Sequence, residues 1–567
     1  MGYTPHVLVV GGGATGTSIA RDLAFRGLEV TLVERGSLAS GATGRTRGLL
    51  RSGAREAVSD SERAARIRAE NRRLRRIAGH CIEETGGLLV DADGGAGLDR
   101  TLAACEEADI DVEELDAGEI QRLEPRLSRT VERALFVPDG AVDPFRLAVA
   151  TARSAREFET TVETHAEVTD LRVESGAVVG AELSRDDEAG TEEVRTDYVV
   201  DAAGARAGEV AAMAGLEVPL DRSRAVRVVA DAQPTEAVVS RMPPSPTLVP
   251  FARRCILGAD TDEDRPPDAD AFGTAAVDRL VEVLSTLVPD LPETPPLRAY
   301  CGLQVSYRHS GEPKAGEKPV PGGGILLDHE ARDDTWGIST VVGASVTTAR
   351  LAAETVADQV CGKFGIDRAC LTAERPLPGA GDVDVEAAAA EFDLDPAVAR
   401  RSVDRLGTRM REVLGSEVPN PVVCACEAVT RAEVTDAIED GTGDRADLEP
   451  VRVRTRAGMG TCQGGQCCHR LAAQLFPAET AGTVGETLKA FYDRRWAGRR
   501  HALYGEALAG AMATYALHAT TMNRDVTPPS AAGGLERAAS AERTDPEVLG
   551  TDLNLDAFDS GPEWGEE

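Results

Sequence analysis

The pattern of apolar and polar positions at the start of the chain alternates between strand and helix. Residues 6–10 form a short apolar run, a helical pattern continues to Arg26, and Leu28–Glu34 is a second apolar run. This order predicts a βαβ unit and a parallel sheet. Later elements of the same unit are expected as strands at Val194–Asp201 and Gly324–Asp328 and as an amphipathic helix at Ser345–Val360.

Changes in this pattern predict the domain organisation. Between about residues 215 and 310, proline-rich breaks separate short β-like segments, which predicts a mainly antiparallel domain inserted into the first unit. The expected fold class is therefore α/β combined with α+β, with a Rossmann-like domain at its start. The expected units are residues 1–375 with this insertion, a linker and helical stretch at 376–420, a cysteine-rich domain at 421–475, helices at 476–522 and an acidic, disordered tail at 523–567.

The composition excludes some classes of function. The chain has 567 residues, is 42% hydrophobic and carries a formal charge of −33, so it can form substantial cores but disfavours non-specific binding to nucleic acid. Four of its 62 basic residues are lysines. An acidic, lysine-poor surface is typical of a halophilic protein, because concentrated salt screens the repulsion between its charges.

The sequence also predicts where the protein acts. No stretch approaches the roughly 18–20 apolar residues that a membrane helix requires. The N-terminus runs directly into the first strand and lacks the basic and apolar regions of a signal peptide. We therefore expect a cytoplasmic protein that reaches the inner face of the cell membrane only through a partner protein.

A glycine motif lies between the first strand and the first helix. Gly11, Gly13 and Gly16 follow the GxGxxG pattern, which permits a tight turn and a close approach of the backbone to a diphosphate at the helix N-terminus. Glu34 ends the second strand, where its carboxylate can accept a hydrogen bond from a ribose 2′-OH. An acidic group there disfavours NADP, and the motif alone leaves FAD and NAD open.

Five of the eleven cysteines cluster near the C-terminal end. Cys424 and Cys426 form a CxC pair, and Cys462 and Cys467 form a Cx₄C pair. Four thiolates in two close pairs can bind Zn²⁺ or a [2Fe–2S] cluster, and glycines around Cys462 would bring backbone N–H groups to the sulfurs. The spacing matches zinc knuckles less well. Cys468 is an additional cysteine, and its neighbour His469 is expected to lie on the surface rather than bind metal.

Several segments together resemble one protein family. These are the glycine motif, Gly41–Arg55, Val137–Leu147, Glu167–Asp170 and Tyr198–Gly204. They closely resemble the A subunits of anaerobic glycerol-3-phosphate dehydrogenases, FAD flavoproteins of the glutathione-reductase and D-amino-acid-oxidase superfamily. The cysteine-rich segment resembles a bacterioferritin-associated-ferredoxin-like domain.

The resemblance implies the cofactors and partners. It implies a [2Fe–2S] cluster on the four paired cysteines and an electron-transfer chain through B and C subunits to quinone. It implies FAD at a set of matching positions, namely Gly11, Gly13, Gly16, Glu34, Thr43, Gly44, Val168, Gly204 and Gly343. A flavin accepts two electrons and a [2Fe–2S] cluster passes one at a time, so the pair indicates a dehydrogenase that hands electrons to another carrier.

The substrate pocket departs from the family pattern. Gln304 stands where the family has an arginine for the substrate phosphate, and Ser345 stands where it has a lysine. Arg55 is retained, and Lys318 is expected at the position of a further family arginine. Arg47 and Arg51 replace two histidines, and they contribute new positive charge to the pocket, face solvent or pair with nearby acids. No catalytic base can be assigned from the sequence.

Three functions remain open at this point. The first is oxidation of sn-glycerol 3-phosphate to dihydroxyacetone phosphate, with Arg55, Lys318 and Arg51 holding the phosphate and Gln304 and Ser345 lining the site. The second is oxidation of another small anionic 2-hydroxy acid or amino acid by a diverged paralogue. The third is a catalytically idle protein for electron transfer or assembly. The first is the leading hypothesis, and the other two are its alternatives, because intact FAD motifs with an altered pocket are what the second and third would look like.

Overall fold

A computed structural model of the chain gives the architecture. It describes residues 3–91, 96–185, 190–242, 246–264, 274–309, 314–415, 420–440, 447–475 and 481–521. The acidic tail expected at 523–567 lies outside the described residues.

The first unit is built on a seven-stranded sheet with the order β19-β20-β21-β13-β1-β2-β9. Strands β21, β13, β1, β2 and β9 are parallel, and β20 and β19 add an antiparallel edge. The strands are β1 (His6–Val10), β2 (Glu29–Glu34), β9 (Thr161–Thr164), β13 (Tyr198–Asp201), β19 (Glu317–Val320), β20 (Gly324–Asp328) and β21 (Ile338–Val342).

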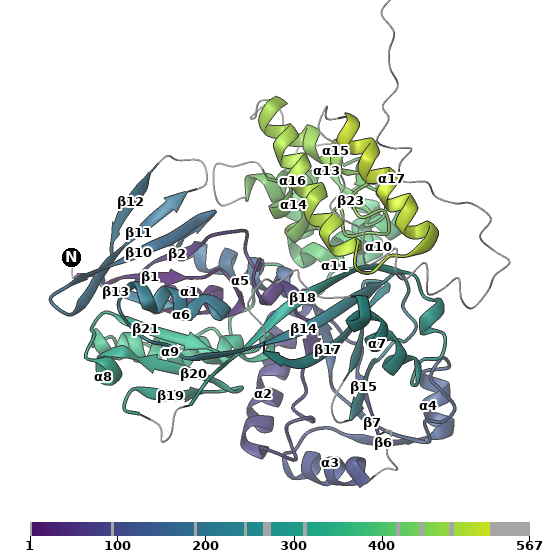
Figure 1. Ribbon diagram of the computed structural model, residues 1–567, viewed down its shortest axis with the longest axis horizontal. Helices are drawn as coiled ribbons and strands as arrows, with labels where there is room; N and C mark the ends of the chain where they lie inside the picture. The colour runs from purple at the N-terminus through teal and green to yellow at the C-terminus, as the bar shows by residue number, and fades with distance from the viewer. Residues whose placement is uncertain are drawn as a thin grey trace, which may run out of the picture.

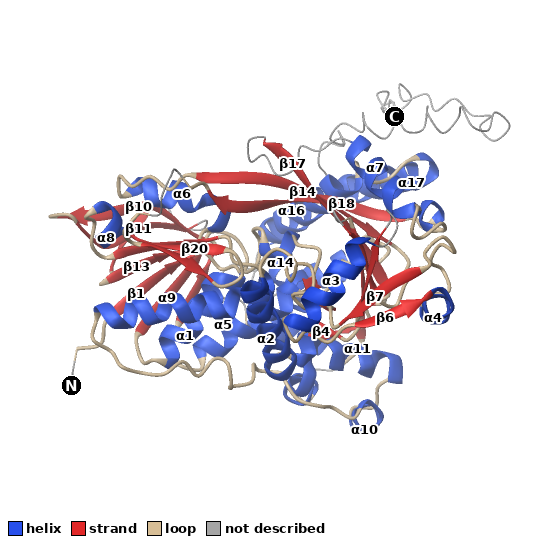
Figure 2. Ribbon diagram, turned by 90° about the horizontal axis from the view of Figure 1, so that it is seen from below, coloured by secondary structure: helices blue, strands red, loops and turns tan. Residues whose placement is uncertain are grey.

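Helices cover one face of this sheet and a small sheet covers the other. Helices α1 (Ala14–Phe25), α5 (Pro144–Arg156) and α9 (Ala349–Lys363) pack together on the first face, where Ile19, Val149 and Val356 enter the core. Figure 2 shows them below strands β1 and β13. The second face packs against α6 (Ala207–Met213) and the three-stranded sheet β10 (Ala166–Glu174), β11 (Ala177–Arg185) and β12 (Thr191–Arg195).

The second unit contains an eight-stranded, largely antiparallel sheet with the order β18-β14-β17-β16-β15-β5-β7-β6. Residues 220–307 supply β14 (Leu220–Ala230), β15 (Val238–Met242), β16 (Thr247–Phe251), β17 (Arg254–Asp264) and β18 (Pro296–Tyr307), as well as α7 (Thr274–Ser285) and η4 (Leu291–Glu293). The remaining strands are β5 (Gly87–Asp91), β6 (Glu113–Asp116) and β7 (Arg133–Val137). The insertion expected at 215–310 is therefore only part of the sheet, because β5 pairs in parallel with β15 and brings β7 and β6 with it.

The other elements of residues 43–348 lie in or between these two units. They are η1 (Thr43–Arg45), β3 (Leu49–Leu50), α2 (Ser61–Ile77), η2 (Gly79–Cys81), β4 (Ile82–Glu83), α3 (Ala96–Glu107), α4 (Ala117–Leu123), β8 (Gly140–Val142), η3 (Gly204–Arg206), α8 (His329–Asp333) and η5 (Val346–Thr348). Strands β3, β8 and β4 form a small sheet beside the antiparallel one.

The C-terminal part is mainly helical and packs on the antiparallel sheet (Figure 1), where α16 contacts β18. It begins with α10 (Val385–Glu391), α11 (Pro396–Leu406), η6 (Gly407–Arg409) and α12 (Met410–Leu414). The cysteine-rich domain follows with β22 (Val422–Cys424), β23 (Val429–Thr430), α13 (Arg431–Glu439), α14 (Leu448–Thr455), α15 (Cys468–Ala472) and η7 (Ala473–Leu475), and then come α16 (Ala481–Arg499) and α17 (Gly505–Thr521).

Three expected elements differ from the structure. The single strand expected at Val194–Asp201 is wrong: Val194 lies in β12, and β13 begins at Tyr198 in another sheet. The amide of Asp197 donates to His6 O between them, so the chain changes sheets there. The helix expected from Ser345 begins at Ala349, after a 3₁₀ turn capped by Ser345. The helical stretch expected at 385–414 is interrupted between α10 and α11, at residues 392–395, and again at Gly407, whose φ is 54°.

Within the ranges that the structure describes, no helix combines the length and apolar character needed to cross a membrane.

Candidate functional site

Four of the predicted cofactor residues lie along one edge of the parallel sheet. Gly11 directly follows β1, Glu34 ends β2, and Gly343 directly follows β21. Gly204 lies just after β13, which pairs between β1 and β21. Because these strands are parallel, their carboxyl ends meet at the same edge, which is where open α/β sheets bind nucleotides.

The glycine turn after β1 leaves no room for side chains. Gly11 has a φ of 113°, and a Cβ there would lie 2.6 Å from the carbonyl oxygen of Ala202. A Cβ on Gly16 would lie 1.9 Å from the carbonyl oxygen of Gly11. Glycine is therefore required at both positions so that α1 can pack against the strand it follows.

The N-terminus of α1 is open to an anion. Gly13 is its N-cap and makes no side-chain cap, and the first turn holds no acidic residue. Thr43 accepts a hydrogen bond from the amide of Ala14 at 3.0 Å. Glu34 accepts one from the amide of Gly12 at 2.7 Å, which fixes its carboxylate beside the turn. The N–H groups of the first turn and the helix dipole suit the diphosphate of a dinucleotide, so these residues fit FAD.

The remaining predicted cofactor positions differ in what they do. A Cβ on Gly44 would lie 2.3 Å from Ala39 O, so this glycine serves local packing. Val168 is buried, with 6% of its surface exposed, in the small sheet on the second face. Gly204 has a φ of 61° and open space around its Cβ position, so the backbone here can approach a ligand.

Strand β18 passes over the same edge and places Gln304 near it. A Cβ on Gly302 would lie 2.7 Å from Arg45 O, and the Tyr300 hydroxyl donates to Thr46 O at 2.9 Å. On the other side of Gln304, the carbonyl of Val305 approaches Gly343. Gln304 itself is exposed. The structure therefore brings this position to the predicted flavin edge.

Arg51 and Ser345 are brought together by the turn η5. The Arg51 amide donates to the hydroxyl of Thr347 at 3.2 Å, and Ser345 is the N-cap of that turn. The guanidinium of Arg51 pairs with Glu56 at 3.0 Å and is 22% exposed. The side chain of Arg51 therefore pairs with a nearby acid, which was one of the alternatives expected for it. Part of the guanidinium still faces solvent.

The guanidinium of Arg55 is bound by two buried side chains of the protein. Its Nη1 lies 2.7 Å from a carboxylate oxygen of Asp139, which is fully buried, and its Nη2 donates to the Ser240 hydroxyl at 2.6 Å. Asp139 also accepts from the amide of Ser52 at 2.8 Å. A substrate phosphate at Arg55 would compete with this buried carboxylate. No sequence pattern indicated these partners, which come from a separate loop and from β15.

The other two cations lie in different surroundings. Lys318 is exposed on β19, the outermost strand of the sheet, in register with Leu326. Arg47 is buried, with 8% of its surface exposed, so it does not face solvent.

The four cysteines of the two predicted pairs meet in the C-terminal domain. Cys467 contacts Cys424 and Cys462, and Cys462 contacts Cys426. Contact with the Cys467 thiol lowers the pKa of Cys424 to about 7 and that of Cys462 to about 5. All cysteines of the chain are free thiols. This donor set fits a metal centre with four sulfur ligands.

Backbone amides point at two of these sulfurs. The amides of Gly458 and Glu427 donate to Cys424, and those of Gly464 and Gln466 donate to Cys462. Such hydrogen bonds stabilise negative charge on sulfur and raise the reduction potential of an iron–sulfur cluster. The glycine-rich segment around Cys462 thus does what the sequence analysis expected.

A buried arginine, Arg495, and two half-buried ones, Arg298 and Arg499, lie between the cysteines and β18. Arg495 on α16 donates to the side chain of Gln463, which follows Cys462, and Arg499 lies within electrostatic reach of Cys462. Arg298 on β18 approaches Gly498 of the same helix. Within the described residues, the Nε atoms of all three arginines lack a hydrogen-bond partner. Burial and then the charge of Arg452 lower the pKa of Arg298 to about 10. Sequence inspection missed this positive region because its members come from distant segments.

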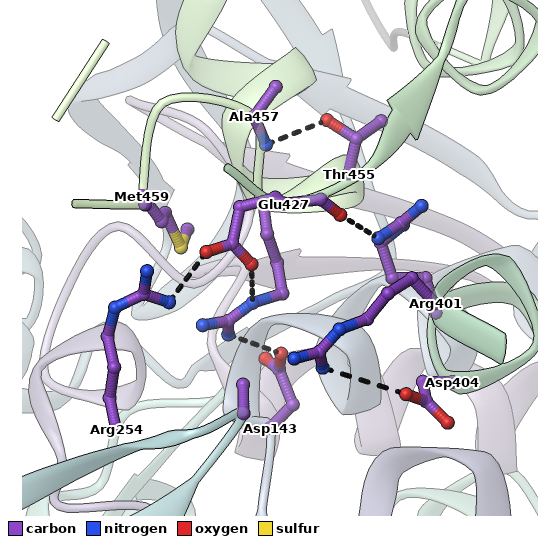
Figure 3. Close-up of polar contacts among 12 residues, drawn as sticks. Asp143, Arg254, Arg401, Asp404, Glu427, Thr455, Ala457 and Met459 are labelled. Carbon is purple, nitrogen blue, oxygen red and sulfur yellow. Dashed lines mark hydrogen bonds and ion pairs between the residues drawn. The ribbon is translucent and has the colours of Figure 1, made fainter. Parts of the chain in front are cut away.

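An ion cluster also fastens the cysteine domain to the rest of the protein (Figure 3). Glu427, which follows Cys426, accepts from Arg254 of β17 at 2.6 Å and from Arg456 at 3.3 Å. Arg456 also donates to Asp143, the N-cap of α5, at 3.2 Å. Burial alone would raise the pKa of Glu427, but Arg456 and Arg254 outweigh it and hold that pKa below its ordinary value. The carboxylate therefore stays charged and links the cysteine domain to β17 directly and to α5 through Arg456.

Comparison with known proteins identifies the family. Residues 6–359 match the FAD dependent oxidoreductase family, and residues 422–477 match the BFD-like [2Fe-2S] binding domain. The A1 subunit of the anaerobic glycerol-3-phosphate dehydrogenase from Haloferax volcanii is 45% identical over 95% of this chain and 94% of its own. The chain belongs to this family of dehydrogenase A subunits. Its counterpart from Escherichia coli K12 is 36% identical over 88% of this chain and 94% of its own.

Solved structures share the fold of this family member. A glycerol-3-phosphate dehydrogenase from Bacillus halodurans complexed with FAD matches with a TM-score of 0.63 over 93% of this chain and 96% of that one, at 18% identity. A glycine oxidase from Geobacillus kaustophilus matches with a TM-score of 0.51 over 67% of this chain and all of that one, at 25% identity. The expected fold class and both expected cofactor domains are thereby confirmed.

Proposed function

We propose that this protein oxidises sn-glycerol 3-phosphate to dihydroxyacetone phosphate with FAD and passes the electrons through a [2Fe–2S] cluster. The observation that carries the proposal is the 45% identity to a relative of that name over nearly the whole length of both chains. Bound FAD would supply the hydride acceptor for the carbinol carbon. The glycine turn, the α1 N-terminus and Glu34 would hold it at the edge of the parallel sheet.

The substrate would lie where β18 crosses this edge. Gln304 on β18, Ser345 at the start of η5 and the partly exposed guanidinium of Arg51 are the side chains that we assign to the substrate phosphate. Arg55 is assigned to the wall of the pocket, because Asp139 and Ser240 already occupy both ends of its guanidinium. Lys318 remains a candidate for a more distant contact, since it lies on the outer strand of the same sheet.

The electrons would leave the flavin through the C-terminal domain. Cys424, Cys426, Cys462 and Cys467 are assigned as the cluster ligands. A [2Fe–2S] centre held by four thiolates carries net negative charge, so Arg495 and Arg499 on one side and Arg298 on β18 would stabilise it electrostatically. These arginines line the contact between α16 and β18, which would join the substrate region to the cluster.

We also propose that the protein works in a multisubunit complex. The relatives are named as A subunits, which supports further B and C subunits that accept the electrons and deliver them to quinone. Attachment at the inner face of the membrane would then come from a partner.

The test is turnover of a substrate panel by the purified, FAD-loaded chain with an artificial electron acceptor. We expect oxidation of glycerol 3-phosphate and none of glycerol. The double substitution Gln304→Arg with Ser345→Lys should raise kcat/KM for glycerol 3-phosphate by about 10-fold or more, because each charge-assisted contact contributes about 1.5–3 kcal/mol. Ser306→Arg, which adds charge two residues further along β18, is the matched control and should have little effect.

Other outcomes would replace the proposal. Better turnover of lactate-like or amino-acid substrates, with glycerol 3-phosphate inert before and after the double substitution, would assign the chain to the second class. Absence of any turnover, with FAD bound and the cluster reducible, would assign it to electron transfer alone.

A further inference from the structure

A second group of metal-binding side chains lies beside the four paired cysteines. It consists of Cys468 and His469 at the start of α15 and His518 on α17, and each offers one donor atom within 4.8 Å of the others. His518 is 49 residues beyond His469 in the chain. Helices α15 and α17 are packed side by side with α16 (Figure 1), which is how the fold brings the three residues together.

The hydrogen bonds of His518 fix which nitrogen it offers. Its Nε2 lies 3.1 Å from the carbonyl oxygen of Gly465. A carbonyl can only accept, so Nε2 carries the proton and Nδ1 of the neutral ring presents its lone pair. This Nδ1 lies 2.8 Å from Nε2 of His469. A metal-binding histidine usually donates its second N–H to a carbonyl or carboxylate in this way, which orients the ring.

Tyr492 of α16 contacts two members of the group, His518 and Cys468. Its ring stacks on His518 with centroids 4.4 Å apart and an angle of 22°, and its hydroxyl contacts the sulfur of Cys468. Cys468 is fully buried and His518 is 7% exposed, whereas His469 is exposed. The sulfur and one imidazole are thus held in place, and the second imidazole closes the group from the solvent side.

We propose that Cys468, His469 and His518 bind a zinc ion, separately from the four paired cysteines. One thiolate and two imidazoles are borderline-soft ligands that suit Zn²⁺, and three protein ligands leave the fourth position to water on the exposed side. On binding, the Cys468 thiol loses its proton to solvent, and the proton shared between the histidines moves to Nδ1 of His469. The ion would tie α17 to the domain that carries the cluster.

The sequence analysis expected His469 on the surface and without a metal. It is exposed, as expected, but the third ligand could not be recognised from the sequence because it lies on another helix. The proposal does not depend on the substrate or on the identity of the cluster, since none of its ligands belongs to the four paired cysteines.

The experiment uses the full chain with its iron centre loaded. The protein is treated with a chelator and dialysed, and it is then titrated with Zn²⁺ alone. Zinc and iron per chain are measured by mass spectrometry. We expect about one zinc per chain with iron unchanged, and at least about 10-fold weaker zinc binding in His469→Ala and in His518→Ala. His469 is exposed, so its substitution should leave the fold intact. His309→Ala, which removes an exposed histidine that meets the Tyr307 ring edge to face, is the matched control and should bind zinc like the parent.

Titration with Co²⁺ reports the sulfur ligand. The parent should show a sulfur-to-cobalt charge-transfer band in the difference spectrum, and Cys468→Ser should lose that band. The proposal is overturned if the iron-loaded chain binds no zinc. It is equally overturned if His469→Ala binds zinc as tightly as His309→Ala, or if zinc enters only as iron leaves, because the ion would then occupy the four paired cysteines.

Discussion

At the scale of single residues, the surroundings of a charged group decide its role more than its identity does. Arg55 is retained from the family pattern, yet its guanidinium spans Asp139 and Ser240. Asp139 is fully buried and also caps the amide of Ser52. Removal of the arginine would leave a buried carboxylate without its counter-charge, which is among the most costly changes a folded protein can suffer.

Arg55→Ala should therefore lower the free energy of unfolding by about 3–5 kcal/mol. Asp139→Asn in the same chain should recover part of this loss, because the charge that needs a partner is gone. Denaturant unfolding of the parent, the single and the double variant measures both effects. A parent-like stability of Arg55→Ala would mean that Asp139 does not depend on Arg55.

In the double variant, an unchanged KM for substrate would agree with a structural role for Arg55. A KM raised 10-fold or more would show that Arg55 also binds the substrate.

At the scale of elements, the turn between β1 and α1 is set by two glycines in contact. The Cβ position of Gly16 lies 1.9 Å from Gly11 O, and that of Gly11 lies 2.6 Å from Ala202 O. Both contacts are with backbone, which cannot move aside as a flexible side chain can. The α1 N-terminus and its amides keep their position only while both residues remain glycine.

Gly16→Ala should weaken FAD binding by at least about 10-fold, because a methyl group would push α1 away from the turn. Gly79→Ala is the matched control: Gly79 lies in η2, has an ordinary φ and meets nothing within 4 Å of its Cβ position. Flavin absorbance per chain after reconstitution and dialysis measures the difference. Equal flavin content in the two variants would show that the turn does not position the cofactor.

At the scale of the whole molecule, ion pairs dock the C-terminal domain onto the oxidoreductase part. Besides the Glu427 cluster, Asp440 at the end of α13 pairs with Arg153 of α5 at 2.7 Å and with Arg454 of α14 at 3.1 Å. Burial acts to raise the pKa of Asp440, but Arg153 and then Arg454 outweigh it and hold that pKa below its ordinary value. Its stabilising effect is therefore complete above the pKa of an unfolded aspartate and is lost as the pH falls through the lower folded value.

Asp440→Asn should reduce the stability of this docking by about 2 kcal/mol at neutral pH, since partly buried charge-assisted hydrogen bonds of this kind contribute roughly 1.5–3 kcal/mol. Faster proteolysis of the linker at 376–384 would measure the loosening. Because the substitution removes a group whose folded pKa is lowered, the variant should also lose less stability than the parent between about pH 4 and pH 3. Identical cleavage rates and identical acid sensitivity would contradict the docking role.

Features that depend on neighbours in the chain could be predicted without the fold. The βαβ start, the glycine turn, the acid at the end of β2 and the two cysteine pairs are local patterns, and local steric and hydrogen-bonding rules suffice to interpret them. Which distant groups meet depends instead on the packing of whole elements. That packing pairs β5 with β15 and places Asp139 against Arg55. It also brings Arg298 and Arg495 together where β18 contacts α16, and it places His518 beside His469. No spacing along the chain could reveal such contacts, because each joins segments whose separation in sequence carries no information about their distance in space.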